Sequence, residues 1–248
     1  MRLKLISCEI FYREMCAAIA HSPNTIDVTF LPKGLHDIGR EPMLTCVQQA
    51  IDEVTDPRFE AILLGYGLCN KGIEGLEART CPVVIPRAHD CITLFLGSRQ
   101  RYASYFESHP GTYFLTAGWL ERNEIAPDLK DASIPHLVGM DVSYEELVAR
   151  YGVDNAKYLY AMLGDTLRNY TRFTFVRTGS SLDEMFEEQA RAKAQTHHLP
   201  LETVDGDLTL VERLVNGPWD SESFLVLPPG HRVRAQLDNG IIEAEKIS

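Results

Sequence analysis

Apolar runs alternate with helical segments through the first hundred residues, and this alternation limits the possible folds more than any other feature of the sequence. Strands are predicted at residues 2–7, 26–31, 61–64 and 82–85. Helices are predicted over residues 11–20 and 41–54, and from about 90 through 105. The strands show no polar face, which is typical of strands buried on both sides of a parallel sheet. The pattern therefore predicts an α/β fold, with a Rossmann-like parallel sheet and helices on both of its faces.

The second half of the chain is less regular but supplies strands and helices of its own. Strands are predicted at residues 111–116, 172–177, 201–204 and 224–227. Helices are predicted over residues 180–196 and 208–215, and over 143–168 with breaks near Gly152 and Gly164. We therefore expect two similar halves with a cleft between them, an N-terminal half over residues 1–110 and a C-terminal half over 111–248. The polar tail from residue 232 onward is expected to be mobile or to pack at an edge.

The charge balance excludes several classes of partner. The chain of 248 residues has 24 Lys and Arg against 35 Asp and Glu, which gives a net charge of −11 with His neutral. Binding to nucleic acid or to an anionic membrane surface needs clustered cations, and no Lys/Arg run is present. No apolar stretch approaches the roughly 18–20 residues of a membrane span, and the N-terminus lacks a secretory layout. We expect a cytoplasmic protein that binds neither nucleic acid nor membrane.

Thiols and imidazoles follow all four strands of the first half. Because ligands bind beyond the carboxyl ends of strands in an open α/β sheet, we expect these side chains to meet at one edge. Thiolate and imidazole together suit zinc, iron or an iron–sulfur cluster, and three protein ligands with an open position suffice for a catalytic metal. The alternative is that they are buried or satisfied residues of ordinary turns. The predicted metal ligands are Cys8, His36, Cys69, His89 and Cys91.

The other three cysteines are assigned to structure. Cys16 and Cys46 lie within predicted helices, and Cys81 precedes a strand. Six cysteines without a CxxC pair do not indicate a disulfide scaffold or a zinc ribbon.

A glycine-rich loop follows the third strand and is predicted to belong to the site. It does not match a nucleotide-binding motif, so its glycines are interpreted as bringing the backbone close to a metal or ligand. The other interpretations are an anion cradle of backbone N–H groups or a turn that needs positive φ angles. The glycines concerned are Gly65, Gly67 and Gly72.

Further candidates lie in the turns after other strands. Arg87 is predicted to supply a positive charge to a carboxylate or phosphate ligand, or else to pair with a nearby acid. Trp119 follows the strand at 111–116 and is predicted to close the site, and Arg177 is predicted to open an anion pocket before a helix. For both segments an ordinary αβ turn without a role in binding is an equal alternative. Cys91 begins a helix, where the dipole lowers a thiol pKa, so a Cys–His–Asp nucleophile is a weaker alternative.

Three phrases of the sequence occur in a fixed order after the N-terminal strand that ends in a cysteine. They are LGYGLCNKGIEGL, PRAHDCITLFLGSRQRY and PGTYFLTAGWLE. Together they resemble a bacterial and archaeal family of unknown function, whose members are often encoded beside corrinoid-dependent methyltransferases. In that family a Cys follows the first strand, a His the second, a Cys sits in the glycine loop and a His/Cys pair follows the fourth strand. The five predicted ligands match these positions, but the family's YGxCGxGG loop is replaced here by Asn70-Lys71-Gly72 after the cysteine.

The resemblance implies a role in or beside corrinoid and methyl-group metabolism, and it carries no established activity. Combined with the Cys/His site, it predicts a metal-binding protein with zinc or iron. Whether the protein is an enzyme stays open; if it is one, a metal-dependent reaction on a small methylated substrate is expected. One alternative is a non-catalytic accessory or carrier protein for a metal, a corrinoid or a methyltransferase partner. A second alternative is an iron–sulfur redox protein. A bound corrinoid has no motif to support it.

Overall fold

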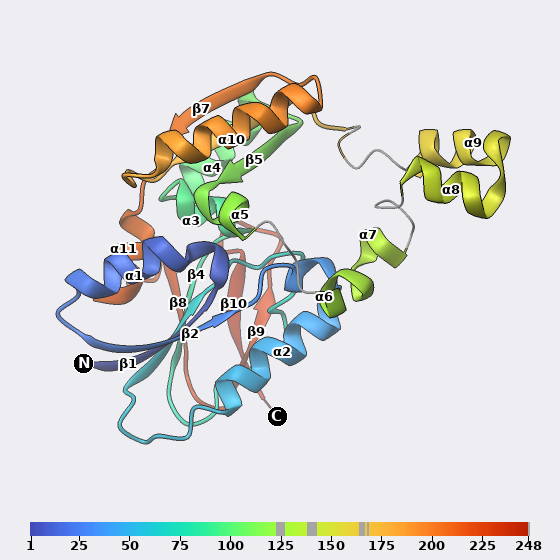
Figure 1. The fold of residues 1–248 in the computed structure, drawn as a ribbon. Helices are drawn as coiled ribbons and strands as arrows, with labels where there is room; N and C mark the ends of the chain where they lie inside the picture. Colours follow the sequence, from blue (N-terminus) through green and yellow to red (C-terminus); the bar gives the residue numbers. More distant parts are fainter. Residues whose placement is uncertain (123–126, 138–142, 164–166, 168, 248) are drawn as a thin grey trace.

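The computed structural model describes residues 1–122, 127–137, 143–163, 167 and 169–247 (Figure 1). Its strands form a five-stranded sheet, a three-stranded sheet and a two-stranded hairpin. The first sheet contains β1 (Arg2–Cys8), β2 (Thr25–Leu31), β3 (Ala61–Gly65), β4 (Val83–Pro86) and β8 (Phe224–Leu227). The second sheet contains β5 (Thr112–Thr116), β6 (Arg172–Arg177) and β7 (Leu201–Asp205), and the hairpin pairs β9 (His231–Ala235) with β10 (Ile242–Lys246).

The order of strands in the first sheet is β2-β1-β3-β4-β8. β1 pairs in parallel with β2 on one side and β3 on the other, so Cys8 lies opposite Leu31 and Ser7 lies opposite Gly65. Every residue of β3 and β4 is buried, which is the burial that continuous apolar strands predict. The predicted α/β class with parallel strands is confirmed, and β8 is an antiparallel strand at the edge.

Successive crossovers from β1 run in opposite directions along this sheet. The chain first moves from β1 to β2 through α1 (Tyr12–His21), and then passes back over β1 to β3 through α2 (Arg40–Asp52). Because such crossovers are right-handed, the two helices cover opposite faces. α11 (Thr209–Asn216) packs beside α1. The carboxyl ends of β1 and β3 therefore flank a topological switch point, where an open α/β sheet has its crevice.

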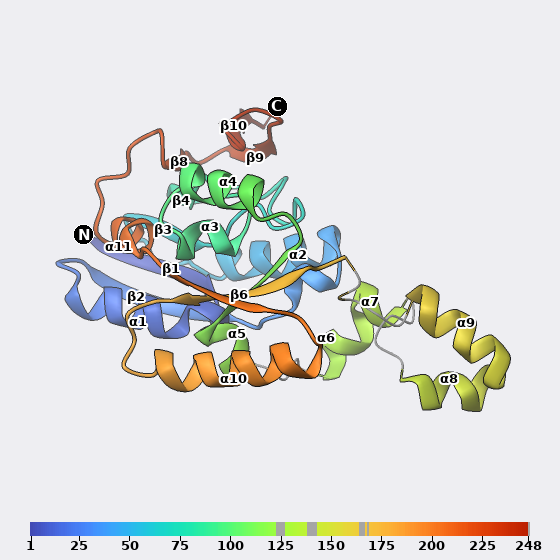
Figure 2. The same cartoon turned by 90° about the horizontal axis from the view of Figure 1, so that it is seen from above.

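The second sheet has its strands in chain order, β5-β6-β7, and all are parallel. Its crossovers run in one direction, so α5 (Ala117–Glu121) and α10 (Asp183–Thr196) pack together on the same face (Figure 2). The opposite face meets α4 (Arg99–Ser108).

The C-terminal part of the chain returns to the first sheet instead of completing a second half. α11 and β8 join the core built on β1 to β4, and the β9–β10 hairpin packs against it through Val233, Ile241 and Ile242. The second sheet has three strands and a smaller core of its own. The structure therefore does not show the two similar halves expected on either side of residue 110, and residues 209–247 belong with the N-terminal core.

Glycines break two of the predicted helices. The helix predicted from residue 90 through 105 is two helices, α3 (Cys91–Phe95) and α4, because Gly97 adopts a φ of 78° between them. Ser98 then begins α4 by accepting the N–H of Arg101 at 3.1 Å. The predicted break at Gly152 is confirmed, and the one at Gly164 lies outside the described residues.

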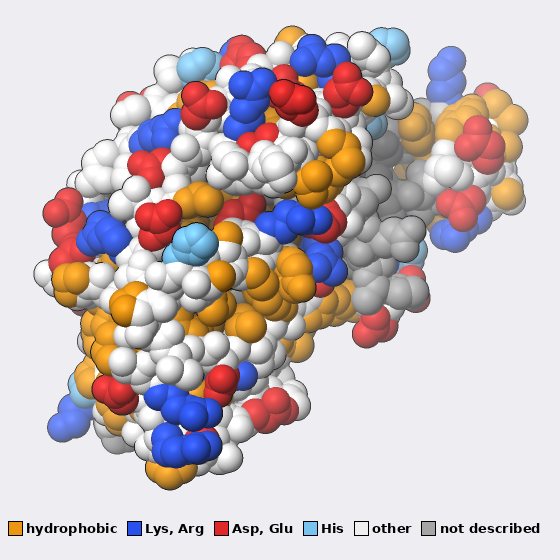
Figure 3. All heavy atoms as spheres, turned by 60° about the vertical axis from the view of Figure 1, so that its left-hand side comes forward, with side chains coloured by type: hydrophobic (Ala, Val, Ile, Leu, Met, Phe, Trp, Pro, Cys, Tyr) orange, Lys and Arg blue, Asp and Glu red, His pale blue; other side chains and the backbone are white. Residues whose placement is uncertain are grey.

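Four further helices lie in the chain between β5 and β6, and two single 3-10 turns follow β1 and β2. α8 and α9 form a hairpin that stands away from the rest of the molecule (Figure 1). These helices are α6 (Pro127–Ala132), α7 (Ile134–Leu137), α8 (Tyr144–Tyr151) and α9 (Val153–Leu163), with the single turns η1 (Glu9–Phe11) and η2 (Leu35–Asp37). None of the helices described is long and apolar enough to cross a membrane. On the face shown in Figure 3, basic side chains are interspersed with acidic ones.

Candidate functional site

A pocket of about 640 Å³ lies at the switch point of the first sheet. It is lined by residues from the turns after β1, β2, β3 and β4, and also by α4, β5 and α5. All five predicted metal ligands line it, and the three cysteines assigned to structure do not: Cys8, His36, Cys69, His89 and Cys91 are at the pocket, and Cys16, Cys46 and Cys81 are elsewhere.

Cys8 ends β1 and is buried at the inner wall of the pocket. The backbone N–H of Ile10 and the hydroxyl of Tyr66 both favour the thiolate form of Cys8. Burial outweighs them and raises the pKa of the thiol to about 11. Tyr66 is itself buried, and its hydroxyl makes no regular hydrogen bond within the described chain. The charge of Lys33 also favours the thiolate, but all three effects together do not offset burial.

The loop that carries Cys69 is held against the turn after β4. The N–H of Leu68 donates to the carbonyl oxygen of Ala88 at 2.8 Å, and the N–H of Cys69 donates to that of His89 at 2.9 Å. Gly67 makes this approach possible, because a Cβ at that position would lie 2.8 Å from the Cα of Asp90. Gly67 therefore allows the Cys69 loop to pack against the turn after β4. This packing brings the Cys69 thiol and the His89 imidazole to the same side of the sheet.

The backbone of this loop is strained at the cysteine itself. Cys69, Asn70 and Lys71 adopt φ angles of 44°, 55° and 63°, in the left-handed region that costs an L-residue roughly 1–2 kcal/mol. Strain of this kind persists only where neighbouring contacts impose it, and it clusters at functional sites. Burial raises the pKa of the Cys69 thiol to about 12, with the charges of Asp90 and Cys8 adding to the effect.

Cys91 begins α3, and Asp90 caps that helix. One carboxylate oxygen of Asp90 accepts the N–H groups of Ile92 at 3.0 Å and Thr93 at 3.3 Å, and the other accepts the hydroxyl of Tyr102 at 2.8 Å. The prediction of a lowered pKa at this helix start is wrong. Burial, the Asp90 carboxylate and the neighbouring thiols hold the pKa of Cys91 well above its ordinary value. A free thiolate nucleophile is therefore not favoured here.

The three thiols disfavour one another's ionisation. Cys8 raises the pKa of Cys69, and both raise the pKa of Cys91. N–H groups nevertheless point at the sulfurs, from the backbone of Gly67 and Cys91 to Cys69 and from the indole of Trp119 to Cys91. The charge of Lys33 acts on Cys8 without offsetting its burial. Buried thiols with N–H donors form a donor set that a soft cation completes. The residues present fit a thiolate-bound metal in this chemical sense.

The donors do not close on a common point in this structure. Among the described residues, no three His, Cys, Asp or Glu side chains form a group that could hold a metal ion. The five predicted ligands thus share a pocket without forming a complete ligand shell, and their joint binding of one metal stays a prediction.

The two histidines lie on the outer part of the pocket. His36 is in η2, with its Nε2 atom 3.2 Å from an oxygen of Asp37, and its ring meets that of Trp119 edge-on at 5.5 Å. The ring of His89 lies 6.4 Å from that of Tyr102. Both imidazoles are therefore within the aromatic lining of the pocket.

Trp119 reaches the pocket from α5, as its predicted role in closing the site requires, and Lys33 holds it there. Lys33 is only 6% exposed, and its ammonium donates to the carbonyl oxygens of Trp119 at 3.2 Å and Arg122 at 2.9 Å. The same ammonium lies 4.4 Å from the centre of the indole. Burial lowers the pKa of Lys33 to about 8. No motif in the sequence marks Lys33 as a site residue, and its place in the turn before His36 is the one local signal for it.

Two predicted glycines act in packing. Gly65 lines the pocket at the end of β3, where a Cβ would lie 2.3 Å from the hydroxyl oxygen of Ser7. Gly72 faces Met43, whose sulfur would lie 2.2 Å from an added Cβ. None of the three predicted glycines has a positive φ angle. In this loop the positive φ angles occur at Cys69, at the two residues after it and at Gly75.

The two predicted arginines do not line the pocket. Arg87 donates to the carbonyl oxygens of Ser221 at 2.9 Å and Gly240 at 2.7 Å, and also to that of Ile242, so it holds the C-terminal segments in place. Arg177 donates to the carboxylate of Glu187 at 2.8 and 2.5 Å. Both guanidinium groups are used within the fold and neither lines this pocket, so their predicted roles in binding a ligand anion stay predictions.

Aromatic residues of α4 complete the pocket, and the sequence analysis missed them. Tyr102 and Phe106 lie four residues apart on one side of α4 and stack with ring centres 6.0 Å apart. Both line the pocket. Their i, i+4 spacing on the second helix after the His89-Asp90-Cys91 turn was the available signal.

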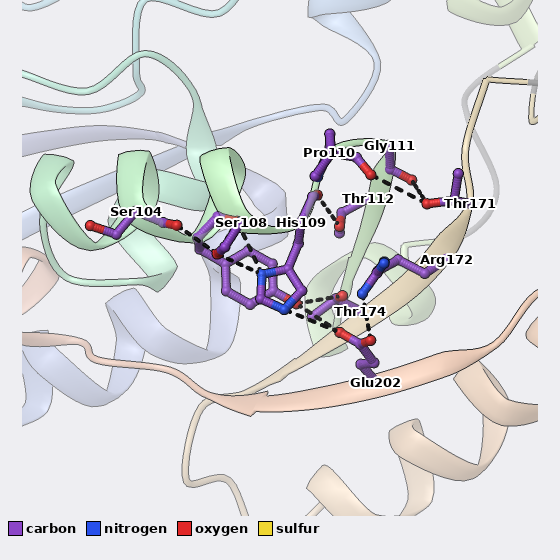
Figure 4. A network of polar contacts seen from close by, with 11 residues as sticks. Ser104, Ser108, His109, Pro110, Gly111, Thr112, Thr171, Arg172, Thr174 and Glu202 are labelled. Atoms are coloured by element: carbon purple, nitrogen blue, oxygen red, sulfur yellow. Dashed lines mark hydrogen bonds and ion pairs between the residues drawn. The ribbon is translucent and has the colours of Figure 1, made fainter.

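A polar network on the other side of α4 fixes that helix against the second sheet (Figure 4). The hydroxyl of Tyr105 hydrogen-bonds that of Thr174 at 2.9 Å, and the ring of His109 stacks on Tyr105 at 4.4 Å. Glu202 accepts from Tyr105 at 3.4 Å and pairs with Arg172 at 2.6 Å. Because these contacts hold one side of α4, its opposite side presents aromatic rings to the pocket in a defined orientation.

Comparison with known proteins gives a family and no function. A family model described as protein of unknown function (DUF1638) matches residues 30–215, three quarters of the chain. Neither the curated proteins nor the solved structures contain a match.

Proposed function

The chain belongs to the DUF1638 family of proteins of unknown function, and we propose that it is a metal-binding protein whose site is the pocket at the switch point. Cys8, Cys69 and Cys91 would hold zinc or iron as thiolates, with His36 or His89 as a further ligand. The observation that carries the proposal is that turns after four successive strands deliver these five side chains to one pocket.

Electrostatics supports a cation among the thiols. Each buried thiol has a raised pKa, so ionising it alone costs free energy. A bound cation reverses this balance, since it compensates the charge that burial and the neighbouring thiolates oppose. Binding would draw the side chains together and release protons.

The bound metal would supply Lewis-acid activation of a substrate or of a thiolate in the pocket. The residues of the chain have separate tasks. The N–H groups on the sulfurs hold the thiolates in place, the Asp90 carboxylate fixes the turn that carries His89 and Cys91, and the Lys33 ammonium keeps Trp119 over the pocket. The aromatic lining excludes water from a bound ligand.

The metabolic setting of the proposal comes from the sequence resemblance alone. It is a role in or beside corrinoid and methyl-group metabolism, with a small methylated molecule as substrate. A non-catalytic carrier for a metal, a corrinoid or a methyltransferase partner would use the same ligands, as would an iron–sulfur redox protein. Turnover separates the enzyme from the carrier, and a brown colour with visible absorption identifies a cluster.

The test is metal content after anaerobic purification, measured by mass spectrometry together with a thermal melt. Cys69→Ser should lose metal and keep most of its thermal stability, since a sheet domain of this size has enough apolar core to fold without metal. Cys46→Ser is the matched control, because Cys46 lies on α2 and does not line the pocket. Full metal content in Cys69→Ser, or equal loss in both variants, would overturn the proposal.

A further inference from the structure

We propose that the pocket binds a small organic cation of the quaternary ammonium class beside the thiols. This inference names a ligand class for the proposed metal site and rests on that function for taking the pocket as the working site. The evidence for it comes from the aromatic rings and carboxylates of the pocket lining, and not from the cysteines and histidines of the proposed metal site.

The first observation is the concentration of aromatic rings. Eight of the 23 residues lining the pocket are Phe, Tyr or Trp, whereas these types make up 9% of the chain. They come from separate parts of the fold. Phe11 and Tyr66 are buried near Cys8, α4 contributes Tyr102 and Phe106, and the second sheet contributes Tyr113 with its neighbours. The faces of aromatic rings carry negative potential, and rings from several directions form a site for an organic cation.

The second observation is the sign of the charges around these rings. The lining contains two carboxylates, Asp37 and Asp90, and no Lys or Arg among the described residues. Two lysines that are not themselves in the lining lie over rings that are: the ammonium of Lys33 is 4.4 Å from the centre of the Trp119 indole, and that of Lys193 is 5.9 Å from the ring of Tyr113. Among the described residues, no Lys or Arg lies over the rings of Tyr102 and Phe106, and Tyr102 hydrogen-bonds Asp90. At this part of the lining a cation would meet aromatic faces and a carboxylate, and an anion would meet like charge.

The third observation distinguishes a quaternary ammonium from a primary one. Both carboxylate oxygens of Asp90 already accept hydrogen bonds, from two backbone N–H groups and from Tyr102. An oxygen of Asp37 lies 3.2 Å from the His36 ring. A primary ammonium needs acceptors for three N–H donors, and few are available here. A quaternary ammonium has no N–H group, so it loses nothing by binding among rings.

The probes that test this are choline and 3,3-dimethyl-1-butanol, which have the same shape but differ in charge. Calorimetric titration at one ionic strength should show choline binding at least about tenfold more tightly than the neutral isostere, a difference within the range of multiple cation–π contacts. Ethanolamine should bind more weakly than choline. Equal affinity for choline and the isostere would overturn the inference.

Variants locate the site. Trp119→Leu and Phe106→Leu should each weaken choline binding several-fold, and Trp119→Phe should retain most of it because a ring remains. Tyr158→Leu on α9 is the matched control, since Tyr158 is 67% exposed and away from the pocket. Phe106 is 52% exposed, so its replacement leaves the fold intact even where that of Trp119 does not. Equal binding by Phe106→Leu, Trp119→Leu and Tyr158→Leu would place choline elsewhere and refute the inference.

The same titrations on Cys69→Ser separate this inference from the proposed function. Choline selectivity in a wild-type protein that contains no metal after anaerobic purification would support the cation site and refute the metal site. Choline selectivity that persists in metal-free Cys69→Ser would show that the cation site does not need the metal. A metal-containing protein without choline selectivity would refute the cation site alone.

Discussion

The turns after the strands of the two parallel sheets use similar residues in different ways. In the first sheet, the turns after β1, β3 and β4 bring Cys8, Cys69 and Cys91 to one pocket. In the second sheet, the turn after β6 has a glycine, a serine and an arginine of the kind that binds anions, yet Arg177 pairs with Glu187. The turn after β7 likewise contributes nothing to the pocket.

The difference lies in the order of the strands. The first sheet has the order β2-β1-β3-β4, so its crossovers diverge at β1 and leave a crevice between their helices. The second sheet keeps chain order and its crossover helices α5 and α10 stay on one face, so no crevice of this kind opens between them. A reactive residue at a strand's carboxyl end therefore becomes a site residue only where the topology opens a space. Trp119 follows β5 and reaches the pocket because α5 packs next to η1.

The largest expected effect comes from adding a methyl group where the turns of the first sheet meet. Gly67→Ala would put a Cβ 2.8 Å from the backbone of Asp90. We expect a loss of about 2–3 kcal/mol of unfolding free energy, as for other overpacked sites, together with loss of metal. Chemical denaturation and metal analysis measure the two effects. Gly179→Ala in the second sheet is the control, because nothing lies within 4 Å of its added Cβ. It should cost only the strain of its φ of 80°, about 1–2 kcal/mol, and leave metal content unchanged.

Arg87→Ala should cost less and should leave the pocket intact. It removes a charged donor from carbonyl oxygens of three C-terminal residues, and we expect about 1–3 kcal/mol of destabilisation. Hydrogen exchange should show faster opening of β9 and β10 with β1 to β4 unchanged. If choline or metal binding falls while stability does not, Arg87 acts in the site after all and the comparison is wrong.

The boundary between the two sheets should respond to pH through Glu14. Glu14 on α1 is buried, and its carboxyl oxygens make no regular hydrogen bond among the described residues. Burial raises its pKa, and the charge of Asp183 at the start of α10 adds to this. The folded protein thus holds this proton more tightly than the unfolded chain does. The resulting stability is fully present below the unfolded pKa and is lost as the pH rises through the folded pKa.

Glu14→Gln should therefore be more stable than the wild type at neutral pH, by about 1–2 kcal/mol. The two proteins should approach equal stability in acid. Thermal melts of both proteins from pH 4 to pH 8 measure the difference. A difference that does not change with pH would show that Glu14 is not held protonated.

The smallest effect is expected at the turn after β6. The Arg177 side chain is 46% exposed, and Arg191 stays paired with Glu187 at 3.2 Å when Arg177 is removed, so we expect a contribution of about 0–1 kcal/mol. Arg177→Ala should change stability by less than about 1 kcal/mol and leave metal and choline binding as in the wild type. Loss of either ligand in this variant would show that the second sheet contributes to the site and would end the comparison.

Local patterns in the sequence predict the strands closely. The strands predicted at residues 61–64, 172–177 and 224–227 are found at Ala61–Gly65, Arg172–Arg177 and Phe224–Leu227. The helix predicted over 208–215 is α11, Thr209–Asn216. The spacing of apolar residues within a stretch of four to eight residues is enough to indicate each of these elements, so contacts with distant parts of the chain are not needed to predict them.

The sequence alone placed Cys8, Cys69, His89 and Cys91 directly after strands of one sheet, because strand ends are local and parallel strands share an edge. The tertiary structure alone decided that α11 and β8 complete the first sheet, that Tyr102 and Trp119 face the thiols, and that Arg87 and Arg177 are already paired. Each of these depends on contacts between residues far apart in the chain. Distant segments pack together in the arrangement that buries the most apolar surface. This arrangement decides which side chains become partners, and the local spacing of apolar residues does not reveal it.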